Sequence, residues 1–270
     1  MKIVVIGGTG LIGTQVLQKL ILGSHEAVPA ARYHGVDLMT GEGLAQILEG
    51  AEVVINLTNS PTFDETSLDF FRTSTTNLLA AGAHAAVRHQ VVLSIVGVDR
   101  VPQVDYFRAK AVQEDLLRQG PTPYSIVRAT QFFEFMDTVI SWTSEDKAVR
   151  LPSTRIQPVA AADVVDAVVE VSLGVPLSGI RNVAGPDVFR LDELGRLTLA
   201  ARGDGRSVIT DDRAGMFAAV TGDELVAGAD AVDLALSTLI DGVALEPVRY
   251  QDWIQKFSGV RGPLPGGYQA

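Results

Sequence analysis

The sequence contains no cysteine among its 270 residues. Disulfide bonds, thiolate chemistry and cysteine-ligated zinc sites are therefore excluded, and a reducing compartment such as the cytoplasm is expected. The four histidines, His25, His34, His84 and His89, do not show the spacing of metal ligands, so we expect no metal site.

Basic residues and long apolar runs are also scarce. The chain carries 22 lysines and arginines against 32 aspartates and glutamates, a formal net charge of −10. Such an acidic surface repels nucleic acids and anionic membranes, and no apolar run reaches the roughly 18 residues of a membrane-spanning helix. Hydrophobic residues nevertheless make up 47% of the chain, enough for a sizeable core. We expect a soluble cytoplasmic protein that binds a small-molecule substrate and neither nucleic acid nor membrane; formation of a homo-oligomer is compatible with the sequence.

The first thirteen residues join an apolar, β-branched segment to a helix through a run of glycines. Residues 1–6 are followed by Gly7, Gly10 and Gly13, and apolar residues then recur at helical spacing. The first turn of a helix has amide groups without intrahelical acceptors and a partial positive charge, so it attracts anions. The alternative is an ordinary glycine-rich turn without a ligand. The position of these glycines between a strand and a helix favours a diphosphate site. The expected contact residues are Gly7, Thr9, Gly10, Leu11, Ile12 and Gly13.

Strand-like and helix-like segments alternate along the chain, which is typical of a parallel sheet covered by helices on both faces. Strands are expected at 27–31, 52–57, 90–96 and 124–128, and helices at 66–86, 106–118, 131–143, 163–173, 191–201 and 223–239. Only two residues separate Arg32 from a strand-like piece at 35–38, too few for the crossover between parallel neighbours, so we expect a vestigial or lost third strand. Because the pattern loosens later, residues 1–150 are predicted to form a nucleotide-binding domain and 151–270 a smaller substrate-side lobe.

A tyrosine and a lysine lie four residues apart on one expected helix. Tyr106 and Lys110 therefore share a helix face, and Asp105 suits the N-cap of that helix. A free tyrosine has a pKa near 10 and is a poor base at neutral pH, but a neighbouring ammonium stabilises its phenolate. In this interpretation Tyr106 exchanges a proton with a carbonyl oxygen during hydride transfer, whereas the alternative is a solvated pair on the helix surface.

These two motifs together, Gly7-x-x-Gly10-x-x-Gly13 and Tyr106-x-x-x-Lys110, resemble the short-chain dehydrogenase/reductase superfamily, specifically its atypical NmrA-like, NAD(P)H-binding branch. The segment Arg128-Ala129-Thr130-Gln131-Phe132-Phe133 is also similar. The resemblance implies a Rossmann-type, doubly wound parallel sheet with a small C-terminal substrate lobe. It further implies that NADP or NAD is bound by the glycine-rich turn, the end of the second strand, Asn56, Asn59 and Lys110.

The residue at the end of the second strand distinguishes the two dinucleotides. An acidic residue there suits the free ribose 2′-hydroxyl of NAD, whereas a basic one suits the 2′-phosphate of NADP. This sequence has Arg32, whose planar guanidinium matches phosphate geometry. We therefore expect NADP rather than NAD; a solvated loop arginine is the alternative.

Two members of the superfamily's catalytic set differ here. Ser94 follows the pattern of the hydroxyl that polarises the substrate carbonyl, although a shifted register would put Val96 there and leave Ser94 as a structural serine. The asparagine expected early in the preceding helix is replaced by Phe71 or Arg72. The aromatic residues at 132–135 either line a nicotinamide or substrate pocket or belong to the core.

Three functions follow from these observations. The leading hypothesis is an NAD(P)-dependent oxidoreductase that transfers hydride to or from a small carbonyl or quinone-like substrate, with Tyr106 as acid/base and Lys110 and Ser94 assisting. The second is an NmrA-like redox sensor or regulator that binds dinucleotide without turnover; such proteins typically lack the Tyr/Lys pair. The third is an enzyme like the nucleotide-sugar epimerases and dehydratases, which share the pair.

Overall fold

The computed structural model describes residues 1–227, 239–240, 243–244 and 248–258. The chain divides into two compact units. Unit 1 comprises residues 1–128 and 164–181, and unit 2 comprises residues 129–163 and 182–270. Most of helix α6 (Ala161–Leu173) and of strand β9 (Gly179–Val183) therefore belongs to unit 1, although both follow residue 150. The domain division expected near residue 150 stays a prediction.

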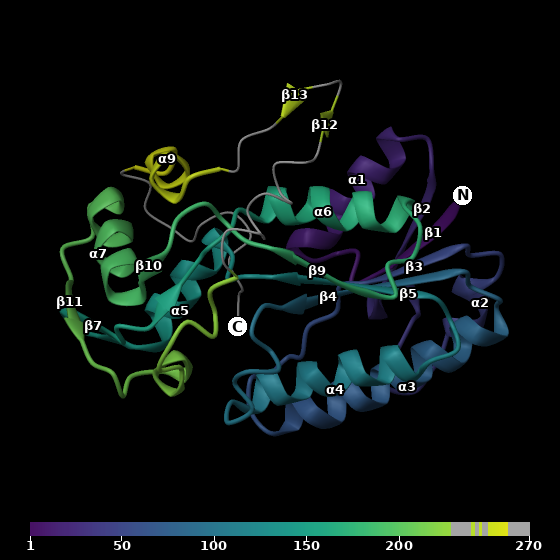
Figure 1. Ribbon diagram of the computed structural model, residues 1–270, viewed down its shortest axis with the longest axis horizontal. Coiled ribbons are helices and arrows are strands. Elements are labelled where there is room, and N and C mark those ends of the chain that lie inside the picture. Colours follow the sequence, from purple (N-terminus) through teal and green to yellow (C-terminus); the bar gives the residue numbers. More distant parts are fainter. Residues whose placement is uncertain (228–238, 241–242, 245–247, 259–270) are drawn as a thin grey trace. The chain divides into compact units, whose positions relative to one another are not determined.

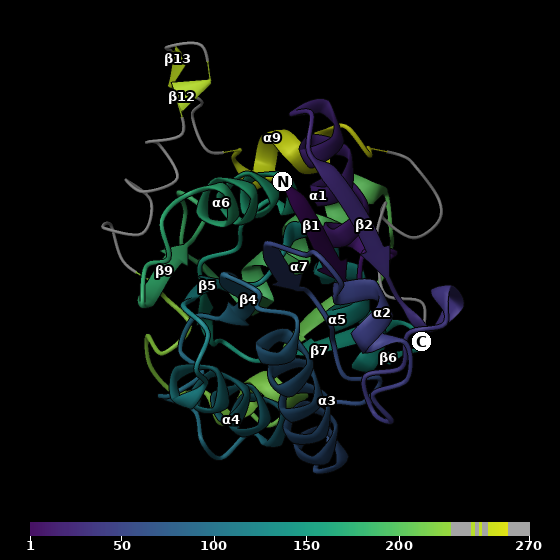
Figure 2. The ribbon, with the colours of Figure 1, turned by 90° about the vertical axis from the view of Figure 1, so that its right-hand side faces the viewer.

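A six-stranded sheet forms the centre of unit 1. Besides α6 and β9, unit 1 contains the strands and helices β1 (Lys2–Ile6), α1 (Leu11–Leu22), β2 (Glu26–Ala30), η1 (Arg32–His34), α2 (Leu44–Leu48), β3 (Val53–Asn56), α3 (Thr66–His84), β4 (His89–Ile95), α4 (Asp105–Gln119) and β5 (Tyr124–Ala129). The strand order is β2-β1-β3-β4-β5-β9, and β1 pairs in parallel with β2 and β3, as β3 does with β4. Helices α1 and α6 cover one face of the sheet and α3 and α4 the other (Figures 1 and 2). The expected α/β fold class is confirmed.

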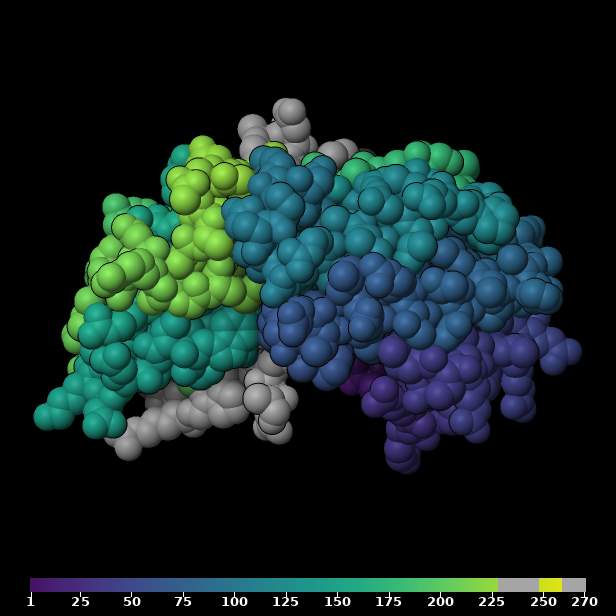
Figure 3. Space-filling view, turned by 90° about the horizontal axis from the view of Figure 1, so that it is seen from below, coloured from purple at the N-terminus to yellow at the C-terminus, as the bar shows by residue number. Residues whose placement is uncertain are grey.

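Helices α3 and α4 pack side by side, and their outer sides face the viewer in blue and blue-teal in Figure 3. Their inner sides carry buried residues, among them Phe71 and Lys110. This pair of helices therefore brings side chains from two distant parts of the sequence beneath β3 and β4.

The third strand is absent from the described residues, as the sequence predicts. After β2 the chain forms the short 3-10 helix η1 and then a loop, so β2 stays at the sheet edge. Val36 and Leu38, from the strand-like piece, are buried in the core. Asn77 of α3 donates its side-chain amide to the carbonyl oxygens of Leu38 (2.9 Å) and Met39 (3.1 Å). These bonds satisfy backbone groups that strand pairing would otherwise satisfy.

Helix α4 begins one residue earlier than the sequence suggests. Val104 has the extended backbone of an N-cap residue, with φ −94° and ψ 119°, and Asp105 is the first helical residue. The Asp105 carboxylate accepts a hydrogen bond from Arg108 at 2.5 Å, one turn along the same helix. The expected N-cap role of Asp105 is therefore wrong.

Unit 2 is built from short strands and helices. They are η2 (Phe133–Phe135), α5 (Met136–Trp142), β6 (Ser144–Glu145), β7 (Ala148–Leu151), β8 (Arg155–Ile156), β10 (Phe189–Arg190), α7 (Leu191–Arg202), β11 (Ser207–Thr210), η3 (Met216–Ala219), β12 (Leu239–Ile240), β13 (Val243–Ala244) and α9 (Tyr250–Gln255). The single helix expected at 131–143 is instead η2 followed by α5. The helix expected at 223–239 is not formed at 223–227, and 228–238 lie outside the described residues.

For Phe133 of η2, the structure decides between the two roles expected for the aromatic residues at 132–135, pocket lining or core. Its ring is buried and packs at 5.0 Å from the ring of Tyr250 and 5.5 Å from that of Trp253, measured between centroids. Phe133 is therefore a core residue of unit 2. Among the described residues, no helix combines the length and the apolar character needed to cross a bilayer.

Replacement of Asn77 by alanine is expected to destabilise the protein. The change leaves the carbonyl groups of Leu38 and Met39 without their donor, which typically lowers the free energy of unfolding by about 1–3 kcal/mol. Urea unfolding of the wild type and the variant measures this loss of free energy. Arg72→Ala, on the same helix, is the matched control, because Arg72 forms an exposed ion pair with Asp69 at 3.5 Å, and such pairs contribute little to stability. Equal stability losses in the two variants would contradict the role of Asn77.

Candidate functional site

The glycine-rich turn connects β1 to α1 and has no room for side chains at several positions, among them Gly7 and Gly13. Gly7 has φ +76°, and a Cβ there would lie 3.0 Å from the carbonyl oxygen of Leu57. A Cβ on Gly13 would lie 2.2 Å from the carbonyl oxygen of Gly7, so only glycine lets the helix approach the turn this closely. Gly10 is the N-cap, and no described residue in the first turn of α1 is acidic. The amides of residues 11–13 are therefore free of intrahelical acceptors, as an anionic diphosphate requires.

The remaining contact residues predicted for this turn differ in their exposure. Thr9 and Gly10 are exposed, Leu11 is half-buried and Ile12 is buried. The side chain of Ile12 thus packs in the core while its backbone amide belongs to the helix N-terminus. For Ile12 and Gly13 the backbone is the part that suits an anion.

Tyr106 is held from two sides within unit 1. Its side chain is only 8% exposed. Its hydroxyl donates a hydrogen bond to Oδ1 of Asn59, in the segment between β3 and α3. Its ring lies 4.9 Å from that of Phe63 and 5.8 Å from that of Phe71, which meets it edge-on. The phenol therefore has one defined position.

Lys110 lies one helical turn after Tyr106 and is buried, with 3% exposure. Its ammonium donates to the carbonyl oxygen of Leu93 at 2.7 Å and to Oε1 of Gln113. It also lies 4.8 Å from the centre of the Phe71 ring, a cation–π contact. Burial lowers the pKa of Lys110 to about 7. The positive charge that the sequence interpretation assigns to Lys110 is therefore lost at a lower pH than that of an exposed lysine.

A cluster of ion pairs beneath Lys110 explains why burial dominates its pKa. Glu114 is the nearby carboxylate that opposes the effect of burial. Its oxygens already accept hydrogen bonds from Arg128 at 2.7 and 2.9 Å and from Arg118 at 2.6 Å. Arg128 also contacts Asp99 at 3.2 Å. With two guanidinium partners, Glu114 is a weak source of negative potential for the lysine.

Two buried polar atoms near the carboxyl ends of β3 and β4 have no hydrogen-bond partner among the described residues. They are Nδ2 of Asn56 and Oγ of Ser94. The Asn56 amide is oriented by its Oδ1, which accepts from the backbone N and the Oγ1 of Thr58 at 3.1 and 2.7 Å. Buried polar atoms are normally satisfied, so both atoms fit a bound ligand that supplies the missing partner. Tyr106 is thus bonded to Asn59 and not to Ser94; the choice between Ser94 and Val96 stays a prediction.

Arg32 lies in η1, directly beyond the end of β2, where the sequence interpretation puts it. Its side chain is 74% exposed, and its Nε lies 3.5 Å from Oδ2 of Asp37. The other carboxylate oxygen of Asp37 accepts from the backbone N of Met39 at 2.7 Å. The guanidinium is therefore accessible to a phosphate, with one carboxylate that competes for it.

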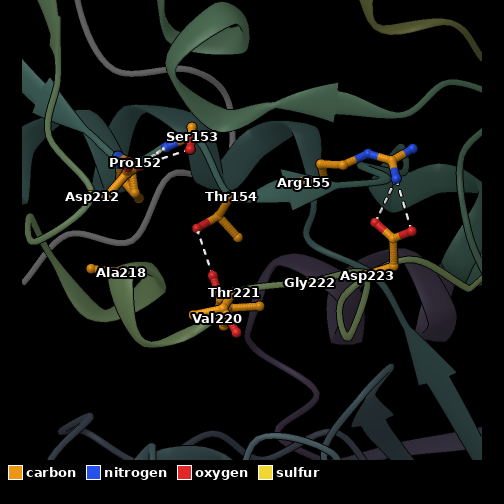
Figure 4. A pocket seen from close by; sticks show the side chains of 10 residues that line it. All are labelled: Pro152, Ser153, Thr154, Arg155, Asp212, Ala218, Val220, Thr221, Gly222 and Asp223. Atoms are coloured by element: carbon orange, nitrogen blue, oxygen red, sulfur yellow. Dashed lines mark hydrogen bonds and ion pairs between the residues drawn. The ribbon is translucent and has the colours of Figure 1, made fainter.

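Unit 2 contains a pocket of about 430 Å³ that the sequence interpretation did not identify (Figure 4). It is lined by Pro152, Ser153, Thr154, Arg155, Asp212, Ala218, Val220, Thr221, Gly222 and Asp223. Nη1 of Arg155 contacts both oxygens of Asp223, at 2.6 and 2.8 Å. Asp212 accepts from the backbone N and the Oγ of Ser153, each at 2.7 Å. These residues come from two segments without a motif, and the charged groups of Arg155 and Asp223 pair with one another.

The expectation of no metal site was based on the spacing of the histidines. No group of three or more His, Asp or Glu side chains in the described part of the chain is arranged to hold a metal ion. The polar groups of the candidate site are hydroxyls, amides, the Lys110 amine and the Arg32 guanidinium, which suit an organic ligand.

The comparisons with known proteins agree with this geometry. A family model described as NAD(P)H-binding matches residues 7–172, which include the glycine-rich turn, Tyr106 and Lys110. No curated protein matches the chain.

Solved structures with the same fold cover between 78% and 95% of the chain. A dTDP-4-dehydrorhamnose reductase from Clostridium acetobutylicum has a TM-score of 0.73 at 17% identity, covering 95% of this chain and 98% of that one. The corresponding reductase from Bacillus anthracis, in complex with NADP, has a TM-score of 0.70 at 15% identity, with coverage of 95% and 98%. A UDP-glucose 4-epimerase from Thermus thermophilus, in complex with NAD, has a TM-score of 0.65 at 16% identity, with coverage of 78% and 86%. At these identities the likeness shows the fold.

The buried amine predicts a distinctive dependence of stability on pH. Because burial lowers the pKa of Lys110 from 10.5 to about 7, the unfolded chain binds one proton more than the folded chain between these values. This lysine therefore makes the free energy of unfolding rise with pH over that window, by up to about 5 kcal/mol. Lys110→Met is expected to lose this contribution. The measurement is urea unfolding of both proteins between pH 7 and 10.

Lys147→Met, which removes an exposed lysine of unit 2, is the matched control and should keep the wild-type pH dependence. A constant stability difference between wild type and Lys110→Met across the pH range would mean that Lys110 is not buried as a neutral amine.

Proposed function

The chain belongs to the NAD(P)H-binding family, and on that premise we propose that it is an NADP-dependent oxidoreductase acting on a small carbonyl or quinone-like substrate. Tyr106 is the acid/base in this proposal. The observation that carries it is the buried phenol of Tyr106 one turn before the buried amine of Lys110, in the same compact unit as the glycine-rich turn.

The residues of unit 1 fit a dinucleotide. The amides of residues 11–13 would hold its diphosphate, and Gly7 and Gly13 let the turn and the first turn of α1 pack closely together. Asn56 at the end of β3, the backbone of Asn59 in the loop that follows, and Lys110 on α4 are proposed to bind the rest of the dinucleotide. When bound, the dinucleotide supplies or accepts the hydride.

The proton chemistry belongs to the side chains of the protein. In carbonyl reduction, Tyr106 donates its hydroxyl proton to the carbonyl oxygen, and the phenolate that remains is stabilised by the Lys110 ammonium. In the reverse direction, the phenolate takes the proton of the alcohol. The Oγ of Ser94, buried without a partner among the described residues, is available to donate a hydrogen bond to the carbonyl oxygen. Because burial lowers the pKa of Lys110 to about 7, its support for the phenolate falls as pH rises through that value.

Tyr106→Phe is expected to lower turnover by about 100-fold or more, which is the typical contribution of a general acid or base. The phenylalanine ring keeps the packing against Phe63 and Phe71, so the dissociation constant of NADPH should stay within about twofold. The measurement is NADPH oxidation with a panel of aldehydes, ketones, quinones and a 4-keto nucleoside-diphosphate sugar. The sugar is included because two of the similar structures are dTDP-4-dehydrorhamnose reductases.

Undiminished turnover in Tyr106→Phe would remove this residue from the mechanism. Tight NADPH binding by the wild type without turnover on any acceptor would favour a dinucleotide sensor instead.

Arg32→Ala is expected to weaken NADPH binding at least about tenfold more than NADH binding, because the guanidinium is proposed to bind the 2′-phosphate that only NADPH carries. Asp37→Asn is the matched control. It removes the competing charge but keeps an acceptor for the amide of Met39, so NADPH binding should not weaken. The dissociation constants of NADPH and NADH for each variant are measured from the fluorescence of the bound nucleotide. Equal losses for the two nucleotides in Arg32→Ala would refute the preference for NADP.

A further inference from the structure

The hydrogen bond from Tyr106 to Asn59 joins residues 47 positions apart, and no motif of the sequence connects them. Asn59 lies three residues beyond the end of β3. Its side-chain amide accepts the hydrogen bond of the Tyr106 hydroxyl. The contact raises the question of what an amide does at the reacting atom.

The segment that carries Asn59 is fixed by local hydrogen bonds. Asn56 accepts from Thr58 on one side, and the Oγ of the buried Ser60 accepts from the backbone N of Thr62 at 3.3 Å on the other. Asn59 therefore sits between two turns that restrict the position of its backbone. Its amide faces a phenol that is itself held in place by aromatic neighbours.

The aromatic neighbours contribute no hydrogen bond to the Tyr106 hydroxyl. Phe63 and Phe71 contact the ring, and the ring of Phe71 also lies beneath the Lys110 ammonium. Phe71 is one of the two positions at which the superfamily resemblance leads to an asparagine in early α3. In this chain a ring occupies that place, and an amide from the loop after β3 contacts the tyrosine instead.

An asparagine amide is suited to a group that gains and loses a proton. Its Oδ1 accepts the hydroxyl proton of the resting phenol. When the hydroxyl turns to donate this single proton to the substrate, the planar amide can rotate so that Nδ2 donates to the phenol oxygen and then to the phenolate. A carboxylate can only accept, and an aliphatic side chain does neither. The amide itself stays neutral throughout, so the proton passes only between Tyr106 and the substrate oxygen.

We propose that Asn59 is a positioning residue for Tyr106 that hydrogen-bonds the phenol in both of its protonation states. The proposal rests on the acid/base role proposed above for Tyr106. In this proposal the side chain of Asn59 contacts the phenol. The backbone of Asn59 can still contact a dinucleotide.

The test measures the titration of Tyr106 directly, in protein without dinucleotide. Tyrosine labelled with ¹³C at Cζ gives one NMR signal per residue, and the signal lost in Tyr106→Phe identifies Tyr106. Asn59→Asp is expected to raise its titration midpoint by about one pH unit or more, because a carboxylate accepts from the phenol and repels the phenolate. Gln119→Glu adds the same charge at the exposed far end of α4 and should leave the midpoint unchanged.

A second variant covers the case in which Asn59→Asp does not fold. Asn59→Ala is expected to lower kcat at least about tenfold while the dissociation constant of NADPH stays within about twofold. An unchanged Tyr106 midpoint in folded Asn59→Asp would overturn the proposal. So would weaker NADPH binding with unchanged kcat in Asn59→Ala, which would place Asn59 in the dinucleotide site alone. Full turnover in Tyr106→Phe would instead refute the proposed function, whereas the titration would still report on the contact between the two side chains.

Discussion

The burial of the Lys110 ammonium between β4 and the ring of Phe71 is the constraint on which the candidate site depends. An amine without water must be hydrogen-bonded or neutral, and here it has the carbonyl of Leu93, the amide of Gln113 and an aromatic face. These contacts fix α4 against both the sheet and α3. They thereby fix Tyr106 one turn earlier on the same helix. The position of the phenol is thus a consequence of how the lysine is buried.

The same burial makes the site electrostatically sensitive. Glu114 is bound by two arginines and does little to keep Lys110 charged, so desolvation lowers the pKa of the lysine to about 7. A surface lysine would be charged at any physiological pH and would influence the phenol only weakly through water. In the low-dielectric interior, the lysine charge varies over the pH range in which an acid/base catalyst works. The proposed chemistry and the stability of unit 1 are therefore coupled through one proton.

The segment after β3 links the two halves of the site. Gly7 approaches the carbonyl of Leu57 so closely that a side chain there would meet it at 3.0 Å, and the backbone N of Leu57 donates to the carbonyl of Ile6 at 2.9 Å. Two residues further along, Oδ1 of Asn59 accepts a hydrogen bond from the hydroxyl of Tyr106. The glycine-rich turn and the phenol are therefore held by opposite ends of the same short segment.

The sequence by itself determined the alternation of strands and helices, the loss of the third strand and the glycine-rich turn. These features follow from local rules: side-chain periodicity, the minimum length of a parallel crossover and the steric freedom of glycine. Only the tertiary structure decided that the Tyr106 hydroxyl is bonded to Asn59 and that the Ser94 hydroxyl has no partner among the described residues. It also decided the titration range of Lys110 and the assembly of the pocket from residues 152–155 and 212–223. Contacts between residues this far apart, and the desolvation of a charge, depend on how whole elements pack, and no short stretch of sequence records that packing.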